Sequence, residues 1–488
     1  MKKLLIRIVM VLAMLVVLNG VYSKWFFEKD LREHSDIVEL SWQVVDDSCR
    51  IIYLGASSNN SYGLEETDTR KISAYLAEYF PTVKTGDLTK AAGHAQTFYY
   101  LLKQIPANSA VETVVVTMNL RSFGPNWIYS KLETALRKQI VLLEDEPPLV
   151  NRFMLGFKAY PIKTEQEWVD LIYWHRRHDP LNFPYDFPFD NNYAWDSAVG
   201  WNGLCDAEGR RDQKMTELAC HYIKAYGFTI ADDNVRVKDF DAIVDLCRER
   251  GWNLVFNLMA ENVDKAHQLV GDDLLFLIKR NRDYLMDRYE NREGIKVVNN
   301  LSLVRDVNFI DQNWTTEHYY EEGRRMVAQN VAQCLKEFYP ADYFPIEIKA
   351  DTGHYRFAGE ERTLNKQQPY SHALALTADS IRPDWEMVNV AFMMKQADGS
   401  HKTKLTIEKC DAQGQVSFET CPTWPQNLTI GQWEFVTFAL PLDSAFRVSE
   451  QIKIYVYNAS ESAVQIKDLD VSFRPAYLAP YVKAKSER

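Results

Sequence analysis

One serine and one histidine have the types and positions that nucleophilic catalysis requires. Ser57 follows the apolar run 51–54 after a Gly-Ala step, and His318 lies far downstream in the segment 311–318. A serine hydroxyl attacks an ester when a neighbouring base accepts its proton, and histidine accepts protons near neutral pH. The sequence therefore predicts Ser57 as a nucleophile and His318 as its base, if the fold brings the two together.

Two carboxylates lie close enough in sequence to orient His318. Asp311 comes seven residues earlier, and Glu317 is adjacent. Neighbouring side chains on a helix point about 100° apart, so Glu317 is poorly placed if a helix starts there. We expect Asp311 to be the orienting acid.

Two groups are candidates for stabilising an oxyanion. Asn119 directly follows the apolar run 111–118, and Gly93 follows the second expected strand. A hydrogen-bond donor aimed at the developing negative charge is worth roughly a hundred- to a thousandfold in rate. Asparagine is also a common turn residue, so its position alone leaves a structural role for Asn119 open.

Arg121 has two interpretations, and metal chemistry has little support. The guanidinium of Arg121 is suited either to an acidic glycan or acyl carboxylate, or to a structural salt bridge. His175 and His178 can share a helix face, but no third ligand is evident near them in the sequence. We therefore predict neither a metal nor a cofactor.

The residues singled out so far meet only if strands and helices position them at one edge of a sheet. The expected strands cover 50–54, 82–85, 111–118, 252–258 and 295–298. Helical patterns separate them, and a last helix is expected from Glu317, beside His318, to Phe338. This alternation predicts a parallel sheet with helices on both faces, and ligands of such sheets bind at the carboxyl edge.

The strand–helix rhythm stops in two places. Residues 128–235 are rich in Trp, Tyr, Asn, Asp and Pro and predict a helical and loop insertion in an α/β domain that spans 24–340. Residues 341–478 contain short alternating strands with polar turns, which predict an all-β sandwich, followed by a tail at 479–488. The expected fold class is α/β with a helical insertion plus a C-terminal β-sandwich.

The N-terminus predicts export. Lys2 and Lys3 precede an apolar run at 8–18, and Ser23 offers a small residue for cleavage, so 1–23 reads as a secretory signal. The longer stretch 4–27 is the alternative, an uncleaved anchor that would associate the protein with a membrane. The net charge is −11, and no basic run follows the first residues, so nucleic acid is not an expected partner.

The order of the chemical signals resembles that of a known superfamily. Gly55-Ala56-Ser57, then Gly93, Asn119 and His318, resembles the SGNH (GDSL-like) hydrolases, and the segment from Asp311 to Gly323 looks like the end of their envelope-anchored branch. The resemblance implies a flavodoxin-like sheet, Ser57 as nucleophile, the Gly93 N–H and Asn119 side chain as oxyanion donors, and His318 as base.

The chain departs from the superfamily pattern at two positions that bear on the triad. Ala56 stands where these proteins usually have aspartate, and Thr315 stands at the usual position of the acid, three residues before the histidine. Asp311 serves as the third member if the loop bends back, and a Ser–His dyad is the alternative.

The resemblance implies an ester hydrolase that acts on acylated carbohydrate, such as an O-acetylated glycan, through an acyl-serine intermediate. Two alternatives stay open. One is an O-acyltransferase of an envelope polysaccharide, and the other is a non-catalytic glycan-binding or assembly protein on a degenerate SGNH fold. The C-terminal strands at 452–457 and 464–469 resemble jelly-roll modules of glycan-active enzymes, which implies either carbohydrate binding or a rigid spacer.

Overall fold

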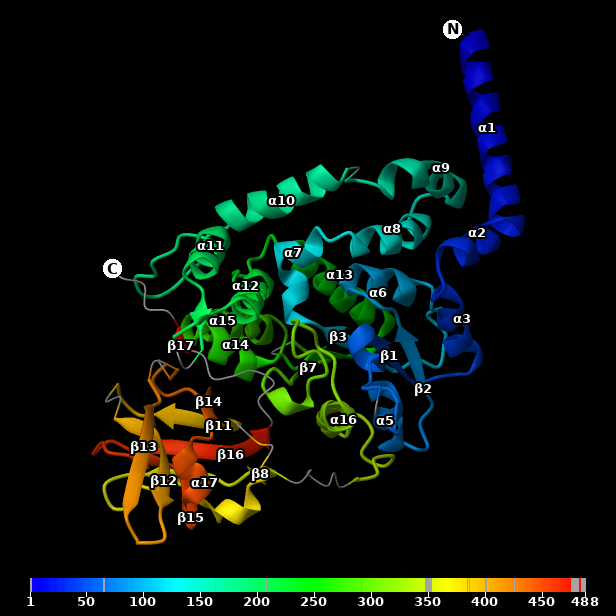
Figure 1. Ribbon diagram of the computed structural model, residues 1–488. Coiled ribbons are helices and arrows are strands. Elements are labelled where there is room, and N and C mark those ends of the chain that lie inside the picture. Colours follow the sequence, from blue (N-terminus) through cyan, green and yellow to red (C-terminus); the bar gives the residue numbers. More distant parts are fainter. Residues whose placement is uncertain are drawn as a thin grey trace.

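The computed structural model contains an α/β domain, a C-terminal pair of antiparallel sheets and a long N-terminal helix (Figure 1). It describes residues 2–474 and 482–483, apart from 65, 163, 207–208, 291, 347–352, 384, 386, 400–401, 425 and 428. Most of the predicted tail, 479–488, lies outside the described residues.

The α/β domain is built on a five-stranded parallel sheet with the order β2-β1-β3-β6-β7. Taken in chain order this is 2-1-3-4-5, the order of flavodoxin-like sheets. The strands are β1 (Ile51–Gly55), β2 (Thr85–Thr89), β3 (Thr113–Met118), β6 (Asn253–Leu258) and β7 (Ile295–Asn299). The second strand therefore starts later than the sequence predicted, because residues 81–84 form a turn.

Helices cover both faces of this sheet, as strands buried on both sides require. Alternate residues face opposite ways: Ile52 and Leu54 of β1 belong to one core, and Ile51 and Tyr53 belong to the other. The first core packs against α3 (Val38–Asp46), α6 (Ala95–Lys103), α13 (Val235–Arg250), α14 (Val263–Val270) and α15 (Asp272–Tyr289). The second packs against α5 (Ile72–Glu78) and α16 (Glu321–Leu335).

A mostly helical segment separates β3 from α13. It contains η1 (Leu120–Phe123), α7 (Pro125–Ile128), α8 (Leu132–Leu142), α9 (Pro148–Lys158), α10 (Glu165–His178), α11 (Asn192–Asn202), β4 (Leu204–Cys205), β5 (Arg211–Asp212) and α12 (Gln213–Tyr226). Figure 1 shows α8, α9 and α10 following one another along one side of the domain. The short strand β17 (Val482–Lys483) pairs with β4.

The C-terminal region forms two antiparallel sheets around one apolar core, consistent with a β-sandwich. One sheet orders β10 (Leu374–Leu376), β15 (Gln451–Asn458), β12 (Thr403–Cys410) and β13 (Val416–Pro422). The other orders β14 (Glu434–Pro441), β11 (Met387–Gln396), β16 (Val464–Arg474) and β8 (His354–Phe357), and β9 (Arg362–Leu364) pairs with β16. The short helices are η3 (Ala378–Ser380) and α17 (Ser444–Val448).

Buried polar contacts join the two domains. The Arg305 guanidinium lies 2.8 Å from Asp264, and the Thr437 hydroxyl of β14 donates to the same carboxylate at 2.7 Å. His354 of β8 lies 2.9 Å from Asp470 and 3.2 Å from Glu322 of α16. We call these contacts the interdomain seam; its members are Asp264, Arg305, Glu322, His354, Thr437 and Asp470.

The N-terminal helix α1 (Lys2–Trp25) projects away from the rest of the protein and continues into α2 (Phe27–His34) (Figure 1). Its length and mean hydropathy of 2.6 are sufficient to cross a membrane. None of its most apolar window is buried.

The predicted start of the last helix is wrong. The last helix of the α/β domain begins at Glu321 rather than Glu317, because Phe309 and Tyr319 form an antiparallel bridge that keeps His318 in an extended segment.

Candidate active site

Ser57 stands at the carboxyl edge of the central strand β1. It is the first residue of a single helical turn, α4 (Ser57–Asn60), and is only partly buried. Gly55 makes this turn possible, because a Cβ at that position would lie 2.7 Å from the Thr89 hydroxyl and 2.8 Å from the Asn59 Cβ. The tight turn holds the Ser57 hydroxyl at the edge where sheets of this kind bind ligands.

His318 reaches Ser57 from the extended segment before α16. Its Nε2 lies 3.0 Å from the Ser57 Oγ, and its Nδ1 lies 2.7 Å from Asp311 Oδ2. The bridge between Phe309 and Tyr319 folds the segment into a hairpin-like loop, and this loop sets Asp311 beside His318. Thr316 donates a further hydrogen bond to the same Asp311 oxygen. Nucleophile, base and acid thus form one hydrogen-bonded chain, as nucleophilic catalysis requires.

Glu317, the alternative orienting acid, points elsewhere. It is 1% exposed, and its carboxylate accepts two hydrogen bonds from the Arg121 guanidinium, one from Nε to Oε1 and one from Nη2 to Oε2 at 2.9 Å. Arg121 also lies over the Trp127 ring, with Cζ 4.7 Å from the ring centroid. Of the two interpretations of Arg121, the structure therefore shows the buried salt bridge, in which the Nε and Nη2 donors are both committed to Glu317.

A second buried carboxylate lies beside this pair. Burial raises the pKa of Glu261 well above its usual value, and the nearby charge of Glu317 raises it further. Glu261 accepts hydrogen bonds from the Tyr226 hydroxyl at 2.6 Å and from the Leu120 N–H at 3.2 Å. Burial and the neighbouring carboxylate therefore both favour the neutral form of Glu261.

The two predicted oxyanion donors differ in availability. Leu54 of β1 pairs with Val116 of β3. Ser57 and Asn119 each follow three residues after this pair, so they lie at the same level of the sheet edge. The Asn119 Oδ1 is buried without a hydrogen-bond partner, and among the described residues no hydrogen bond engages the Nδ2 group that would donate to an oxyanion. The Gly93 N–H, in contrast, donates to the Lys90 carbonyl at 2.8 Å. Gly93 acts as an oxyanion donor only if that turn opens.

Glycine is still required at position 93 for a packing reason. A Cβ there would lie 2.8 Å from the Lys90 carbonyl oxygen and 2.9 Å from the Phe98 ring. The structure thus gives Gly93 a steric role that the sequence did not predict.

Asn59 supports the nucleophile turn and was missed by sequence reasoning. Its side-chain amide donates to Asp87 at 3.0 Å and to Ser73 at 3.1 Å, and its Oδ1 accepts the Ser73 N–H at 2.9 Å. These bonds tie the turn to β2 and α5. Asn59 is visible in the sequence, two residues after Ser57. It was not singled out because asparagine is common in turns whatever its partners.

A cavity of about 360 Å³ adjoins the segment that carries His318. Its walls include Trp314 and Thr315 from that segment, Trp127 from α7, and His221 and Lys224 from α12. Trp314 is half exposed, and its ring lies 4.1 Å from the His221 ring. Burial lowers the pKa of His221 and so favours its uncharged form beside Trp314.

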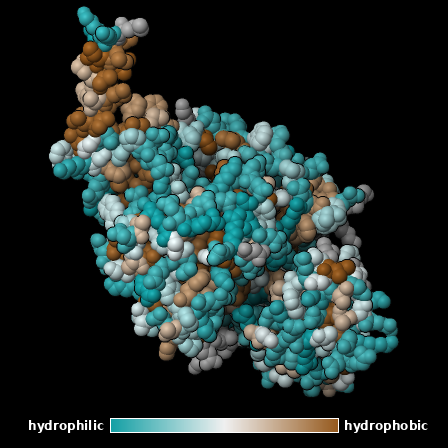
Figure 2. Space-filling model, turned by 180° about the vertical axis from the view of Figure 1, so that it is seen from behind, coloured by the Kyte–Doolittle hydropathy of each residue, from teal (hydrophilic) through white to brown (hydrophobic). Residues whose placement is uncertain are grey.

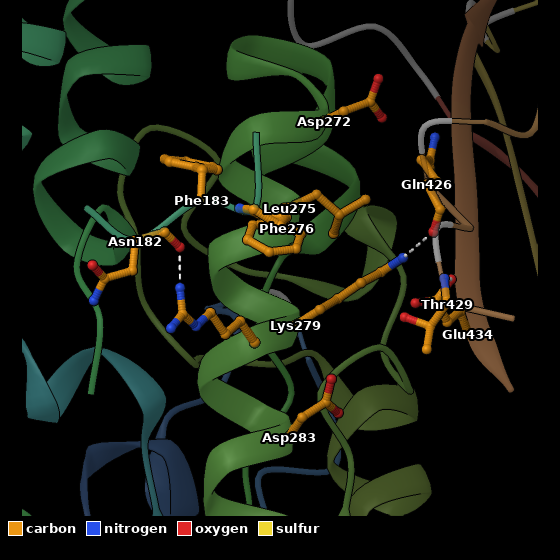
Figure 3. Close-up of a pocket in the computed structure, with 12 residues that line it drawn as sticks. Asn182, Phe183, Asp272, Leu275, Phe276, Lys279, Asp283, Gln426, Thr429 and Glu434 are labelled. Atoms are coloured by element: carbon orange, nitrogen blue, oxygen red, sulfur yellow. Dashed lines mark hydrogen bonds between the residues drawn. The ribbon is translucent and has the colours of Figure 1, made fainter. Parts of the chain in front are cut away.

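A larger cavity of about 550 Å³ lies between α15 and the sandwich, and Ser57, Asp311 and His318 do not line it. Figure 3 shows Lys279 extending from α15 across this space towards Gln426, whose carbonyl accepts its hydrogen bond at 3.1 Å. Burial lowers the pKa of Lys279 to about 8. We interpret this cavity as part of the contact between the α/β domain and the sandwich.

Among the residues that the structure describes, no group of three or more His, Cys, Asp or Glu side chains is placed to hold a metal ion. His175 instead lies 3.0 Å from Asp179, and the His178 ring stacks on Trp174.

Comparisons with known proteins give little help with this site. No protein-family model and no curated protein matches the chain. Solved structures that resemble part of it include the xylan-binding family 22 module of Paenibacillus barcinonensis Xyn10C, at 15% identity, a TM-score of 0.16, and coverage of 25% of this chain and 87% of that one.

The paired family 22 and catalytic modules of Clostridium thermocellum xylanase 10B are similar at 11% identity and a TM-score of 0.17, over 26% of this chain and 27% of that one. The enzymatically active domain of tailspike protein 4 from bacteriophage CBA120 is similar at 10% identity and a TM-score of 0.16, over 21% and 13%. TM-scores this low carry no argument about the fold or the site.

Proposed function

We propose that this protein is a serine-dependent acyl ester hydrolase of the SGNH type that acts on acylated carbohydrate. The observation that carries the proposal is the hydrogen-bonded chain from Ser57 through His318 to Asp311. The three residues come from two segments more than 250 positions apart (|i−j| of 261 for Ser57 and His318), so local turn chemistry does not explain their meeting. The flavodoxin-like strand order and the site at the carboxyl edge also agree with an SGNH fold.

The geometry supports a two-step reaction. His318 Nε2 takes the Ser57 proton as Oγ attacks the ester carbonyl, and the same nitrogen returns the proton to the departing sugar hydroxyl. Water then attacks the acyl-Ser57 ester, losing its proton to His318, and releases the carboxylic acid and free serine. Asp311 holds the Nδ1 proton and stabilises the imidazolium that forms in each step.

Asn119 is the better placed oxyanion donor in this scheme. It follows the strand next to β1 at the same level as Ser57, and among the described residues no hydrogen bond engages its Nδ2 group. The Asn119 Nδ2 group then donates to the oxyanion when substrate binds, and the Gly93 N–H joins it after its turn opens.

The cavity beside Trp314 supports a carbohydrate substrate. Aromatic walls with a few polar groups are typical of small-molecule sites, and this cavity has Trp127 and the half-exposed Trp314 in its walls. Lys224 adds a cationic group there and is a third exposed. An O-acetylated glycan would present its sugar ring to the tryptophans and its ester to Ser57.

One observation favours a second candidate, an O-acyltransferase of an envelope polysaccharide. The helix α1 is long and apolar enough to remain as a membrane anchor. An anchored enzyme would take its acyl group from a membrane carrier and pass it from Ser57 to a glycan hydroxyl instead of water. In both candidates the protein is exported, and the mass of the mature N-terminus distinguishes a cleaved signal from a retained anchor.

The proposal is tested by hydrolysis of p-nitrophenyl acetate and of an O-acetylated polysaccharide by Ser57→Ala and Ser58→Ala. Removing the nucleophile should lower the acyl-release rate by at least about a thousandfold without unfolding the protein. Ser58 is the matched control, because its buried hydroxyl has no partner among the described residues and its loss breaks no hydrogen bond. Turnover by Ser57→Ala at the wild-type rate would show that Ser57 is not the nucleophile, and a wild type without turnover would leave the non-catalytic glycan-binding alternative.

A further inference from the structure

The helix α9 presents an apolar face to the outside of the protein. Phe153 is 72% exposed and Phe157 is 67% exposed, and Val150 precedes them at helical spacing. Gly156, between the two phenylalanines, has no atom near its Cβ position. Side chains three and four residues apart share one face of a helix, so these residues form a single stripe.

The opposite face of α9 is firmly packed, so the exposed stripe does not reflect a loose helix. Leu155 and Ala159 are buried in an apolar cluster with Leu31 of α2. The buried Asn151 amide donates to the carbonyls of Leu142, Glu144 and Glu146, at 3.3, 2.8 and 3.2 Å. The outer stripe therefore has a fixed direction relative to α2.

The same helix is tied to α1. The Leu149 N–H at the start of α9 donates to the Asn19 side chain of α1 at 2.9 Å. Asp30, just after α1, accepts a hydrogen bond from Arg152 at 2.6 Å and another from Tyr22 at 2.7 Å. Figure 1 shows α9 against the base of α1, and in Figure 2 the hydrophobic colour of α1 continues into atoms at its base.

The position of Asn19 along α1 sets the depth of α9. From Lys2 to Asn19 the helix rises about 26 Å at about 1.5 Å per residue. The hydrocarbon core of a bilayer is about 30 Å thick. Leu4 is 63% exposed and Leu18 is 41% exposed, and the large apolar side chains between them are also exposed, so this stretch is available to lipid along its length. If α1 spans a bilayer, α9 lies level with the boundary between hydrocarbon and headgroups.

We propose that the stripe of Val150, Phe153 and Phe157 is embedded in the headgroup boundary of the bilayer that α1 enters. A second contact next to the anchor restricts how the α/β domain turns about α1, and so holds the Ser57 edge of the sheet in a fixed direction relative to the membrane. Trp25 and Phe26, exposed at the end of α1, add aromatic side chains of the kind enriched at membrane interfaces.

The contact is apolar rather than electrostatic. The two basic residues of α9 are each paired, Arg152 with Asp30 and Lys158 with Glu144. We therefore expect α9 to enter bilayers of zwitterionic phosphatidylcholine as well as bilayers that contain anionic phosphatidylglycerol.

The test uses the full chain in phosphatidylcholine nanodiscs doped with a phosphatidylcholine that carries a photoactivatable diazirine on its acyl chain. After irradiation, mass spectrometry locates the lipid adducts. We expect adducts in peptides covering 148–160 as well as in α1. The double variant Phe153→Glu/Phe157→Glu should lower the adducts in 148–160 by about tenfold and leave those in α1 unchanged.

Phe418→Glu is the matched control, because Phe418 is similarly exposed at 62% but lies on β13 of the sandwich. It should leave both sets of adducts unchanged. Adducts confined to α1 in the wild-type chain would overturn the proposal, and so would unchanged adducts at 148–160 in the double variant. Adding phosphatidylglycerol should not raise the adduct yield at 148–160; a requirement for it would contradict an apolar contact.

Discussion

Residues 305–322 contribute to both the candidate active site and the interdomain seam, but the two regions differ in burial. At the site, the Asp311 and His318 side chains are 36% and 22% exposed and accessible to a substrate. At the seam, Arg305 and Asp264 are each 2% exposed. The two regions lie only a few residues apart along the chain.

This difference in burial shows how an exposed site is held in place. Hydrogen bonds between exposed groups contribute little rigidity, whereas a buried charge must keep its partner. Arg305 fixes the start of the stretch against Asp264, and Glu322 fixes its end against His354 of the sandwich. The sandwich thus supports the loop that carries Asp311 and His318, whatever else it binds.

Removing Arg305 is expected to have the largest effect on stability. Arg305→Ala leaves the buried Asp264 carboxylate without its cation and should cost about 3–5 kcal/mol of unfolding free energy. Arg248→Ala is the control, because Arg248 forms an exposed pair with Asp245, at 66% and 75% side-chain exposure, and such pairs contribute about 0–1 kcal/mol. Denaturant unfolding of both variants measures the difference; equal losses would show that the seam does not hold the domains together.

The seam should also make stability depend on pH. Burial alone lowers the pKa of His354, but hydrogen bonds to Asp470 and Glu322 outweigh it and raise the pKa to about 9. Because the folded-state pKa exceeds the unfolded value, the stabilisation is complete below about pH 6.5 and is lost as the pH rises through about 9.

His354→Gln tests this directly. The wild type should lose of the order of 3 kcal/mol more than the variant between pH 6.5 and 9.5, measured as free energies of unfolding. Parallel curves for the two proteins would mean that His354 is not charged in the folded state.

The two buried acids beside the site should respond unequally to replacement by glutamine. Glu317→Gln leaves Arg121 without its bonded carboxylate, whereas burial already favours the neutral form of Glu261. We expect Glu317→Gln to cost about 2 kcal/mol more unfolding free energy at pH 7. A larger loss for Glu261→Gln would contradict the view that the salt bridge to Arg121 is the more important of the two interactions.

The sequence predicted the strand pattern better than the loops. Near-continuous apolar runs such as 111–118 mark strands buried on both faces, and the α/β class with a C-terminal β-sandwich agrees with the structure. The short polar turn after β1 also placed Ser57 correctly at the end of its strand. The start of the last helix was wrong, because the bridge between Phe309 and Tyr319 leaves no trace in residue periodicity.

The sequence could not predict which residues pair with the buried charged side chains, for a physical reason. Arg121 and Glu317 are 196 residues apart, and Arg305 and Thr437 are 132 apart. Charged residues are usually exposed, so nothing in their local pattern distinguishes Arg305 from a surface arginine. Only the folded chain shows which carboxylate each one meets.

The most direct test of the account is fluorophosphonate labelling of the folded protein, with the modified peptide identified by mass spectrometry. The account predicts a label on Ser57 in the wild type, and its loss in His318→Ala while His178→Ala keeps it, since His178 lies far along the chain on α10. A well-folded wild type without label at Ser57, or full labelling of Ser57 in His318→Ala, would contradict an activated serine.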